Sequence, residues 1–263
     1  MNIVVCIKQV PDTTEVQINR ETGTLMRDGV PSIVNPFDMY AIEEGIRLKE
    51  KYGGKVTAVT MGPPQAKNAL AEAIAMGVDD AVLLSDRAFA GSDTLATSYS
   101  LSRAIKKIGD FDFILCGKQA SDGDTAQVGP GIAECLGIPF VAFVKKIENV
   151  EGSKARVERM MEYGYDVVEV PVPVVLTVVK EINEPRLPSL RGKMKARKYE
   201  PNHMTTEDMD VDPDRLGLDG SPTRVIKVFT PEIKKDGEIL EGETPEELAG
   251  KLKQKLKEDG LAV

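Results

Sequence analysis

The most informative part of the sequence is FDFILCGKQASDGDTAQVG, residues 111–129. Its first six residues are apolar except for Asp112, a composition typical of a strand buried on both faces of a sheet. Small and polar residues follow, and helical spacing begins near Ala126 and continues to Leu136. This order predicts a strand that leaves a parallel sheet through a glycine-containing loop and enters a helix.

The same order of strand and helix occurs three times before residue 111. Apolar runs predict strands at 3–7, 56–60 and 81–84, and helical spacing follows at 36–46, 66–74 and 92–108. Asn35 and Pro36 are typical of a helix N-cap and a first helical residue. We therefore expect an α/β fold with a doubly wound, mostly parallel sheet, a three-layer sandwich of the flavodoxin-like or universal-stress-like kind.

The pattern changes outside this series. Residues 16–18 and 24–26 predict a hairpin around Gly23, and residues 144–150, 155–161 and 167–170 predict an antiparallel insertion. Residues 174–179 predict one more strand of the main sheet. The sequence becomes polar and loses its periodicity after residue 183, so we expect an α/β domain at 1–190 and an extended arm at 191–263.

The arm ends in an expected amphipathic helix. Thr244 to Glu247 is a capping-box sequence, and Leu248, Leu252 and Leu256 form a narrow apolar stripe after it. The stripe has to be buried either on the chain's own domain or on a partner subunit. The sequence itself favours neither choice.

Composition argues against several classes of function. With 34 Lys and Arg against 42 Asp and Glu, the net charge of −8 disfavours nucleic acid as a partner. One histidine, His203, and three cysteines without a C-x-x-C pair argue against a catalytic triad, zinc or an iron–sulfur cluster. No apolar run approaches the roughly 20 residues that span a bilayer, and no secretory leader is evident. We expect a cytoplasmic protein without membrane insertion that holds an organic cofactor.

Four segments after strands could form a ligand site, since ligands of open parallel sheets bind beyond the carboxyl ends of the strands. They are residues 8–13, 61–63, 92–97 and 117–129. In the last, Gly117 and Gly123 allow close backbone approach, and the following helix start suits a diphosphate. The loop matches neither a P-loop nor a Rossmann fingerprint, and such a loop is more often a plain turn.

With these residues in view, the chain resembles the β subunit of an electron-transfer flavoprotein over essentially its whole length. The resemblance is carried by VCIKQVPD at 5–12, NPFD at 35–38, AMG at 75–77, GKQA at 117–120 and NEPR at 183–186. It implies an adenine-nucleotide-binding domain in a heterodimer. The C-terminal arm and its helix would dock on the α subunit, which carries an FAD.

The loop at residues 122–130 resembles that of the electron-bifurcating branch, where small residues such as Gly123 and Ala126 leave room for a full FAD. That branch implies NADH as hydride donor. One electron then goes to the α-subunit FAD and an acyl-CoA dehydrogenase-type partner, and the other goes to ferredoxin or flavodoxin. One alternative is a non-bifurcating subunit with structural AMP. Another is a stand-alone ATP-binding stress-type module, against which the arm and terminal helix count.

The resemblance also implies a set of cofactor-binding residues, with no catalytic side chain and no metal. Those expected at the diphosphate and ribitol, beside Gly123, are Asp124, Thr125, Gln127, Val128 and Gly129. Those expected at the adenosine pocket and its approach are Cys6, Asn35, Met61 and Gln119. Those expected to complete the site are Asp93, Thr94 and Thr97, of which the two threonines share one helix face.

Two further expectations concern charge and partner binding. Lys8 and Lys118 are candidates, by position alone, for positive charge near the flavin, and each could equally be an ordinary solvent-exposed lysine. Leu190 corresponds to the leucine with which the family anchors its dehydrogenase partner in an apolar pocket. Arg191 and Gly192 depart from the pattern of the non-bifurcating branch, so the identity of the partner stays open.

Overall fold

The computed structural model describes residues 1–12, 32–226 and 237–261. The chain forms two compact units, Met1–Lys227 and Val228–Val263. The hairpin predicted at residues 16–26 lies outside the described residues. Within the described ranges, no helix is long and apolar enough to cross a membrane.

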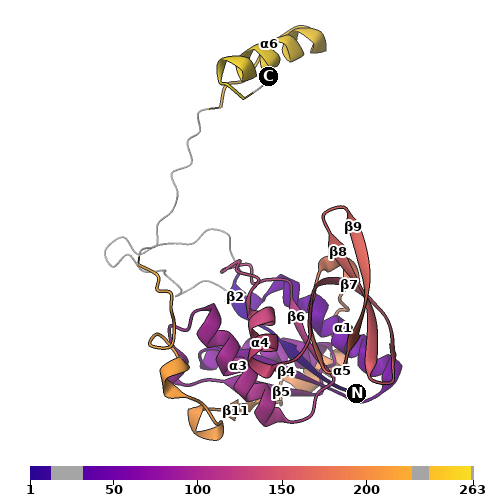
Figure 1. Ribbon diagram of the computed structural model, residues 1–263, viewed down its shortest axis with the longest axis vertical. Coiled ribbons are helices and arrows are strands. Elements are labelled where there is room, and N and C mark those ends of the chain that lie inside the picture. Colours follow the sequence, from indigo (N-terminus) through magenta and orange to yellow (C-terminus); the bar gives the residue numbers. More distant parts are fainter. Residues whose placement is uncertain (13–31, 227–236, 262–263) are drawn as a thin grey trace. The chain divides into compact units, whose positions relative to one another are not determined.

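A nine-stranded sheet forms the centre of the first unit (Figure 1). Its order is β11-β5-β4-β1-β6-β10-β7-β8-β9, and neighbouring strands from β11 to β7 run parallel. The strands are β1 (Asn2–Cys6), β4 (Lys55–Met61), β5 (Asp80–Leu84), β6 (Phe113–Gly117), β7 (Phe140–Glu151), β8 (Lys154–Met161), β9 (Gly164–Pro171), β10 (Val174–Val178) and β11 (Asn202–Met204). A short antiparallel pair, β2 (Gln9–Pro11) and β3 (Ser32–Val34), follows β1.

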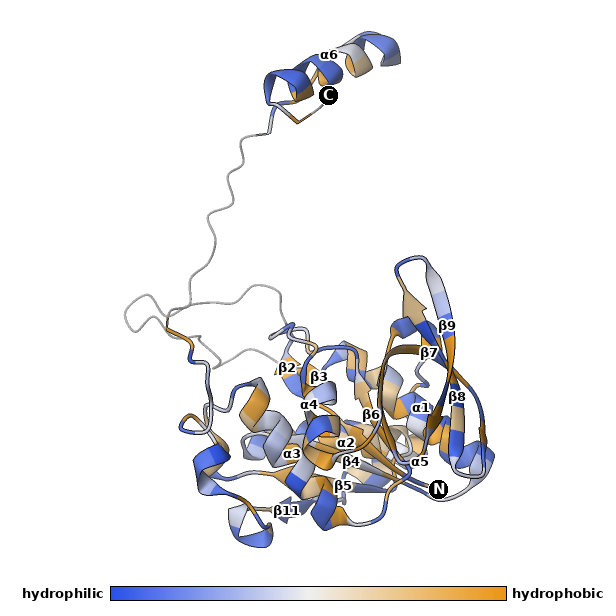
Figure 2. Cartoon of the chain, in the orientation of Figure 1, coloured by the Kyte–Doolittle hydropathy of each residue, from blue (hydrophilic) through white to orange (hydrophobic). Residues whose placement is uncertain are grey.

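Four helices cover the two faces of the parallel sheet. Helices α1 (Pro36–Tyr52) and α2 (Lys67–Met76) share one apolar core, and α3 (Thr94–Ile108) and α4 (Val128–Leu136) share the other. Successive residues of a strand point to opposite faces, so Ile3 and Val5 enter the first core and Val4 and Cys6 the second. This is why β1 reads as one continuous apolar run, and Figure 2 shows apolar residues gathered on these central strands. The three-layer α/β prediction is confirmed.

The antiparallel insertion is also confirmed, with a longer first strand than the sequence predicted. The first residues of β7 pair in parallel with β10, and the later residues pair antiparallel with β8. Strand β9 then pairs antiparallel with β8. The strand expected at 174–179 is β10, which lies between β6 and β7 in the main sheet.

The direction of strand order switches at β1. The chain proceeds from β1 to β4 and β5 on one side and then crosses to β6 on the other. Cys6 and Cys116 are register partners at this switch, and both are buried free thiols. Hydrogen bonding with Cys6 and burial raise the pKa of the Cys116 thiol. Both cysteines therefore pack as small apolar residues of the core shared by α3 and α4.

The first part of the predicted arm lies on the α/β body. Helix α5 (Leu190–Ala196) contacts α2, and β11 pairs with β5. Met209 and Leu216 are buried in the core beside α3. In the second unit, Thr244 is the N-cap residue of α6 (Pro245–Glu258), and its hydroxyl accepts a hydrogen bond from the Glu247 N–H at 3.2 Å.

Candidate cofactor-binding site

The carboxyl ends of β1 and β6 meet at the strand-order switch, and Asn35 ties the loops there together. Its side chain is fully buried. The Asn35 Nδ2 donates to the Gln119 carbonyl at 2.8 Å, and its Oδ1 accepts from the Ser121 N–H at 3.0 Å. Asn35 occupies the predicted N-cap position of α1, but its side chain caps no helical N–H. The amide instead holds the loop that follows β6.

Asp38 provides a second connection between the same elements. The Lys8 N–H donates to Asp38 Oδ2 at 2.7 Å, and a Cβ on Gly117 would overlap the other carboxylate oxygen. Burial raises the pKa of Asp38 to about 7, although hydrogen bonds from Lys8, Asn35 and Gly117 act in the opposite direction. No pattern in the sequence distinguished Asp38 as a candidate site residue. An acid in the first turn of a helix usually indicates only a favourable helix-dipole contact.

The loop after β6 has an unusual backbone. Asp124 and Ala126 have φ values of 53° and 55°, a left-handed conformation that costs residues other than glycine of order 1 kcal/mol or more. The Asp124 N–H donates to the Ala120 carbonyl at 2.9 Å, and its carboxylate accepts from the Gln119 side chain. Helix α4 therefore begins at Val128, two residues later than the sequence predicted. Strain of this kind is concentrated at binding sites, where the surroundings impose it.

Gly123, in the middle of this loop, faces open space. Its φ is not in the left-handed range, and a Cβ there would meet nothing nearer than Lys8 Nζ at 4.0 Å. Lys8 Nζ itself contacts Asp122 Oδ1 at 2.6 Å, in an exposed ion pair. Lys118 lies over the Phe143 ring, 5.7 Å from its centroid. Lys8 therefore reaches the loop from the end of β1, whereas Lys118 belongs to the loop and its ammonium lies over Phe143.

Ser98 joins the starts of α3 and α4. Its hydroxyl lies 2.7 Å from the Thr94 carbonyl and 3.3 Å from the Val128 carbonyl. A Cβ on Gly129 would lie 2.6 Å from Thr177 Cγ2, so only glycine lets α4 approach β10 so closely. The structure thus brings Thr94 and Val128 together on neighbouring helix starts. No feature of the sequence indicated that Ser98 would contact both helices, since it is only one residue of an amphipathic helix.

Both carboxylate oxygens of Asp93 accept hydrogen bonds from other residues of the chain. Its Oδ1 caps α3 by accepting from the N–H groups of Leu95 and Ala96 at 2.9 and 3.1 Å. Its Oδ2 accepts from the N–H and hydroxyl of Thr223 at 3.0 and 2.8 Å. Burial alone would raise the pKa of Asp93, but these hydrogen bonds hold it below the ordinary value. In this structure the carboxylate caps α3 and fixes residue 223.

The other expected site residues lie along the same edge of the sheet. Cys6 ends β1, and the half-buried Met61 ends β4. Thr97 is half-buried in α3, while Thr125 and Gln127 are exposed in the loop before α4. Among the residues that the structure describes, no group of three His, Cys, Asp or Glu side chains could hold a metal ion.

Comparison with known proteins identifies the family. The model of the electron transfer flavoprotein domain matches residues 22–209. An electron transfer flavoprotein subunit beta of Thermoanaerobacterium thermosaccharolyticum is 56% identical over 247 residues, with 94% of each chain covered. The chain belongs to the electron-transfer flavoprotein β-subunit family.

Two other relatives are named for reductase complexes. The caffeyl-CoA reductase-Etf complex subunit CarD of Acetobacterium woodii is 51% identical, over 98% of each chain. The acryloyl-CoA reductase electron transfer subunit gamma of Anaerotignum propionicum is 47% identical, over 97% of this chain and 99% of its own. The family resemblance of the sequence is thereby confirmed, and with it an electron-transport role. Proteins of this family bind FAD or AMP.

In this β subunit, the expected partner anchor Leu190 is the first residue of α5 and is 79% exposed. The Ser189 hydroxyl caps the helix by accepting from the Gly192 N–H at 3.0 Å. Leu187, three residues earlier, is 90% exposed. Large apolar side chains this exposed are typical of interaction sites when they lie together on an ordered segment.

Proposed function

We propose that this chain is the β subunit of an electron-bifurcating electron-transfer flavoprotein. The observation that carries the proposal is the loop after β6, where the backbone takes a left-handed conformation at Asp124 and Ala126 and the exposed Gly123 leaves space beside it. A loop with these features is better explained by binding of an extended dinucleotide than by a simple connection between a strand and a helix. The relatives named for CoA-reductase complexes support the same branch.

In this proposal, FAD is the cofactor and supplies the acceptor for the hydride of NADH. The chain's own residues bind and orient it. Backbone N–H groups at the start of α4 suit the diphosphate, together with the loop residues Asp124, Thr125, Gln127, Val128 and Gly129. Cys6, Asn35, Met61 and Gln119 line the adenosine side. Asp93, Thr94 and Thr97 complete the site through the start of α3.

Positioning falls to two buried side chains and one exposed lysine. Asn35 holds the backbone of the β6 loop through residues 119 and 121, and Asp38 holds the backbone at Lys8. The Lys8 ammonium lies beside the loop, paired with Asp122, and would supply positive charge to a ligand that takes the place of that carboxylate. Redox chemistry then needs no nucleophilic side chain, because a flavin carries the reaction and the protein sets its orientation and electrostatics.

The proposed partners follow from the same assignment. The arm and α6 dock on an α subunit that carries the second FAD. Leu190 enters an apolar pocket of an acyl-CoA dehydrogenase-type flavoenzyme, and ferredoxin or flavodoxin takes the other electron. We place the complex in the cytoplasm, in agreement with its three free cysteines.

Anaerobic titration of the αβ complex with NADH tests this function. We expect NADH to bleach the absorbance of both flavins in the wild-type complex. In Gly123→Leu, the bulky side chain should fill the open space, so that one flavin is lost and NADH no longer reduces the other, while dithionite still does. Ser153→Leu is the matched control, because Ser153 is exposed in the turn between β7 and β8, outside both the proposed cofactor site and the arm. A Gly123→Leu complex that keeps two NADH-reducible flavins would overturn the placement of the cofactor.

A further inference from the structure

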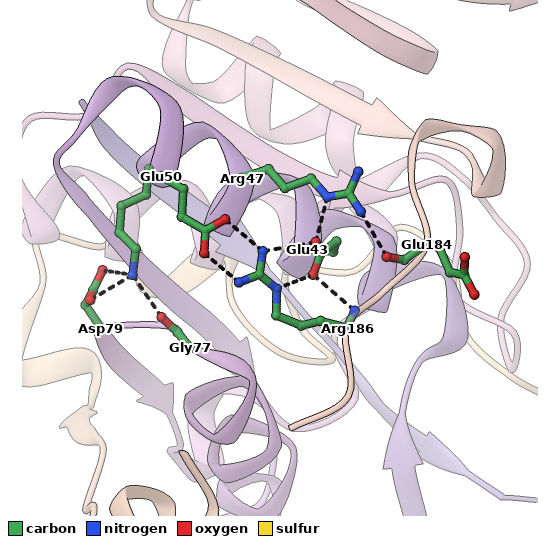
Figure 3. Close-up of polar contacts among 8 residues, drawn as sticks. Glu43, Arg47, Glu50, Gly77, Asp79, Glu184 and Arg186 are labelled. Carbon is green, nitrogen blue, oxygen red and sulfur yellow. Dashed lines mark hydrogen bonds and ion pairs between the residues drawn. The ribbon is translucent and has the colours of Figure 1, made fainter. Parts of the chain in front are cut away.

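The segment that carries Leu187 and Leu190 is held on α1 by a forked arginine (Figure 3). Arg186 Nε and Nη2 donate to the Glu43 carboxylate at 2.8 and 3.1 Å. Arg186 Nη1 and Nη2 donate to the Glu50 carboxylate at 2.6 and 2.9 Å. The Arg186 N–H also donates to Glu43, at 3.2 Å. The Arg186 guanidinium thus joins two carboxylates of α1, and the backbone N–H of Arg186 is bound to one of them, Glu43.

Helix α1 presents these groups on one face. Glu43, Arg47 and Glu50 are spaced by four and three residues, which places them side by side on a helix. Glu43 is buried, and Arg47 Nε also donates to it, at 2.6 Å. Burial alone would raise the pKa of Glu43, but the hydrogen bonds from Arg186 and Arg47 hold it below its ordinary value. Arg47 reaches on to the Glu184 carbonyl at 3.1 Å, so the segment is held before Arg186 as well.

Further contacts fix both ends of the segment. Asn183 Nδ2 donates to the Tyr40 carbonyl and to Glu44 Oε2, each at 3.0 Å. On the other side, Lys195 Nζ donates to the carbonyls of Val78 and Asp79, each at 3.2 Å. The segment is therefore anchored on α1 at its start and beside α2 at its end. The exposed leucines lie between these anchors.

We infer that Arg186 is a positioning residue for partner docking, which holds the backbone of residues 186–190 so that Leu187 and Leu190 are presented before a partner arrives. This inference rests on the proposed docking role of Leu190. A loop that is already ordered loses little conformational entropy when it binds. Because this entropy loss opposes binding, its reduction strengthens association. The planar guanidinium suits the task because it can donate to two carboxylates at once, which a lysine ammonium cannot do with the same geometry.

Hydrogen exchange on the full αβ complex tests the clamp without any dehydrogenase. In Arg186→Met, amides of residues 186–192 should exchange at least about tenfold faster than in wild type, while those of β1 and β6 should not change. Arg186→Lys should lie between the two. Arg156→Met is the matched control, because it removes a 2.6 Å pair with Glu148 on another part of the sheet. Unchanged exchange at residues 186–192 in Arg186→Met would overturn the inference. If Arg186→Met does not fold, Glu50→Gln, which removes the exposed half of the clamp, replaces it.

A second experiment measures the rate of electron transfer to a dehydrogenase at increasing dehydrogenase concentration. The dehydrogenase is one for which the rate of the wild-type complex reaches saturation. We expect Arg186→Met to raise KM for that dehydrogenase about tenfold with little change in kcat and none in flavin content. Leu190→Ala serves as the reference. If Leu190→Ala raises KM and Arg186→Met does not, the clamp is not needed for docking and the inference is wrong. If Leu190→Ala leaves KM unchanged, the proposed docking role itself fails, while hydrogen exchange still decides whether Arg186 orders the segment.

Discussion

Two glycines of the loop after β6 and the start of α4, Gly123 and Gly129, have different roles. One is required by packing, and the other leaves room for a ligand. Gly129 is required by packing, because a Cβ there would lie 2.6 Å from Thr177 Cγ2. Gly123 has no such neighbour. The sequence motif contains both and does not distinguish them. Only the surroundings that the fold assembles around each glycine reveal the difference.

This contrast predicts different effects of alanine at the two positions. Gly129→Ala should lower the free energy of unfolding by about 1–3 kcal/mol, because α4 has to move away from β10. Gly123→Ala should change it by less than about 0.5 kcal/mol. Denaturant unfolding of both variants measures this. Equal losses at the two positions would mean that the space beside Gly123 is not open.

Asp38 predicts a specific dependence of stability on pH. Its pKa rises from 3.8 to about 7 on folding, so the folded chain binds the proton more tightly than the unfolded chain does. The stabilising contribution of protonated Asp38 is therefore full below pH 3.8 and is lost as the pH rises to about 7. Between about pH 5 and pH 7, wild type should lose ~2–3 kcal/mol of unfolding free energy relative to Asp38→Asn. A constant difference between the two proteins across this range would contradict a raised pKa of the buried Asp38 carboxyl.

At the scale of elements, α1 joins the two proposed functional regions. Its N-cap residue Asn35 holds the loop after β6, and its first turn holds Lys8 through Asp38. Its middle turns hold Arg186. The Asn35-Pro36 start and the apolar spacing predicted the helix, but neither indicates what its polar side chains contact. Asn35 illustrates this, since its expected capping hydrogen bond is replaced by two hydrogen bonds to a loop more than eighty residues away.

Asn35→Ala should therefore loosen the loop rather than the helix. The substitution leaves the Gln119 carbonyl and the Ser121 N–H without their partner, which should cost about 2 kcal/mol or more and weaken retention of the proposed cofactor. Cofactor release on dilution of the αβ complex and denaturant unfolding measure the two effects. Asn149→Ala, which removes an exposed hydrogen bond to Glu151, should change neither. Retained cofactor and wild-type stability in Asn35→Ala would argue against the tie.

The strands and helices that the sequence predicted are those with long periodic patterns. Four βα units and the antiparallel insertion were predictable because apolar residues alternate or recur at helical spacing over many positions. Strand β11 was not, because it has only three residues, Asn202–Met204, of which Asn202 and His203 are exposed. It exists because the edge of β5 offers unpaired backbone groups, a property of the assembled sheet. Helix α5 is similarly short and begins with an exposed leucine.

At the scale of the whole molecule, the chain is divided into two units that should be separable. The α/β unit has its own cores, and α6 carries an apolar stripe in which Leu252 is half exposed. The second unit therefore has apolar surface left to bury, which agrees with docking on another subunit. The switch edge that carries the proposed cofactor site lies entirely in the first unit.

Removal of residues 228–263 should leave the first unit folded but weaken its association with the α subunit. We expect the truncated chain to keep the cooperative thermal unfolding of the full chain and to lose co-purification with the α subunit. Substitution of Leu248, Leu252 and Leu256 by serine in the full chain should have the same effect on association. Undiminished association in both variants would show that the arm is not the docking element.

The most direct test of the account is the identity of the nucleotide held at the β1–β6 edge. The chain is co-expressed with its α subunit, the purified complex is denatured, and the released nucleotides are separated by chromatography and counted per heterodimer. We expect two FAD and no AMP per heterodimer. One FAD with one AMP would contradict it, and would make this β subunit a non-bifurcating electron carrier in which the space at Gly123 has another purpose.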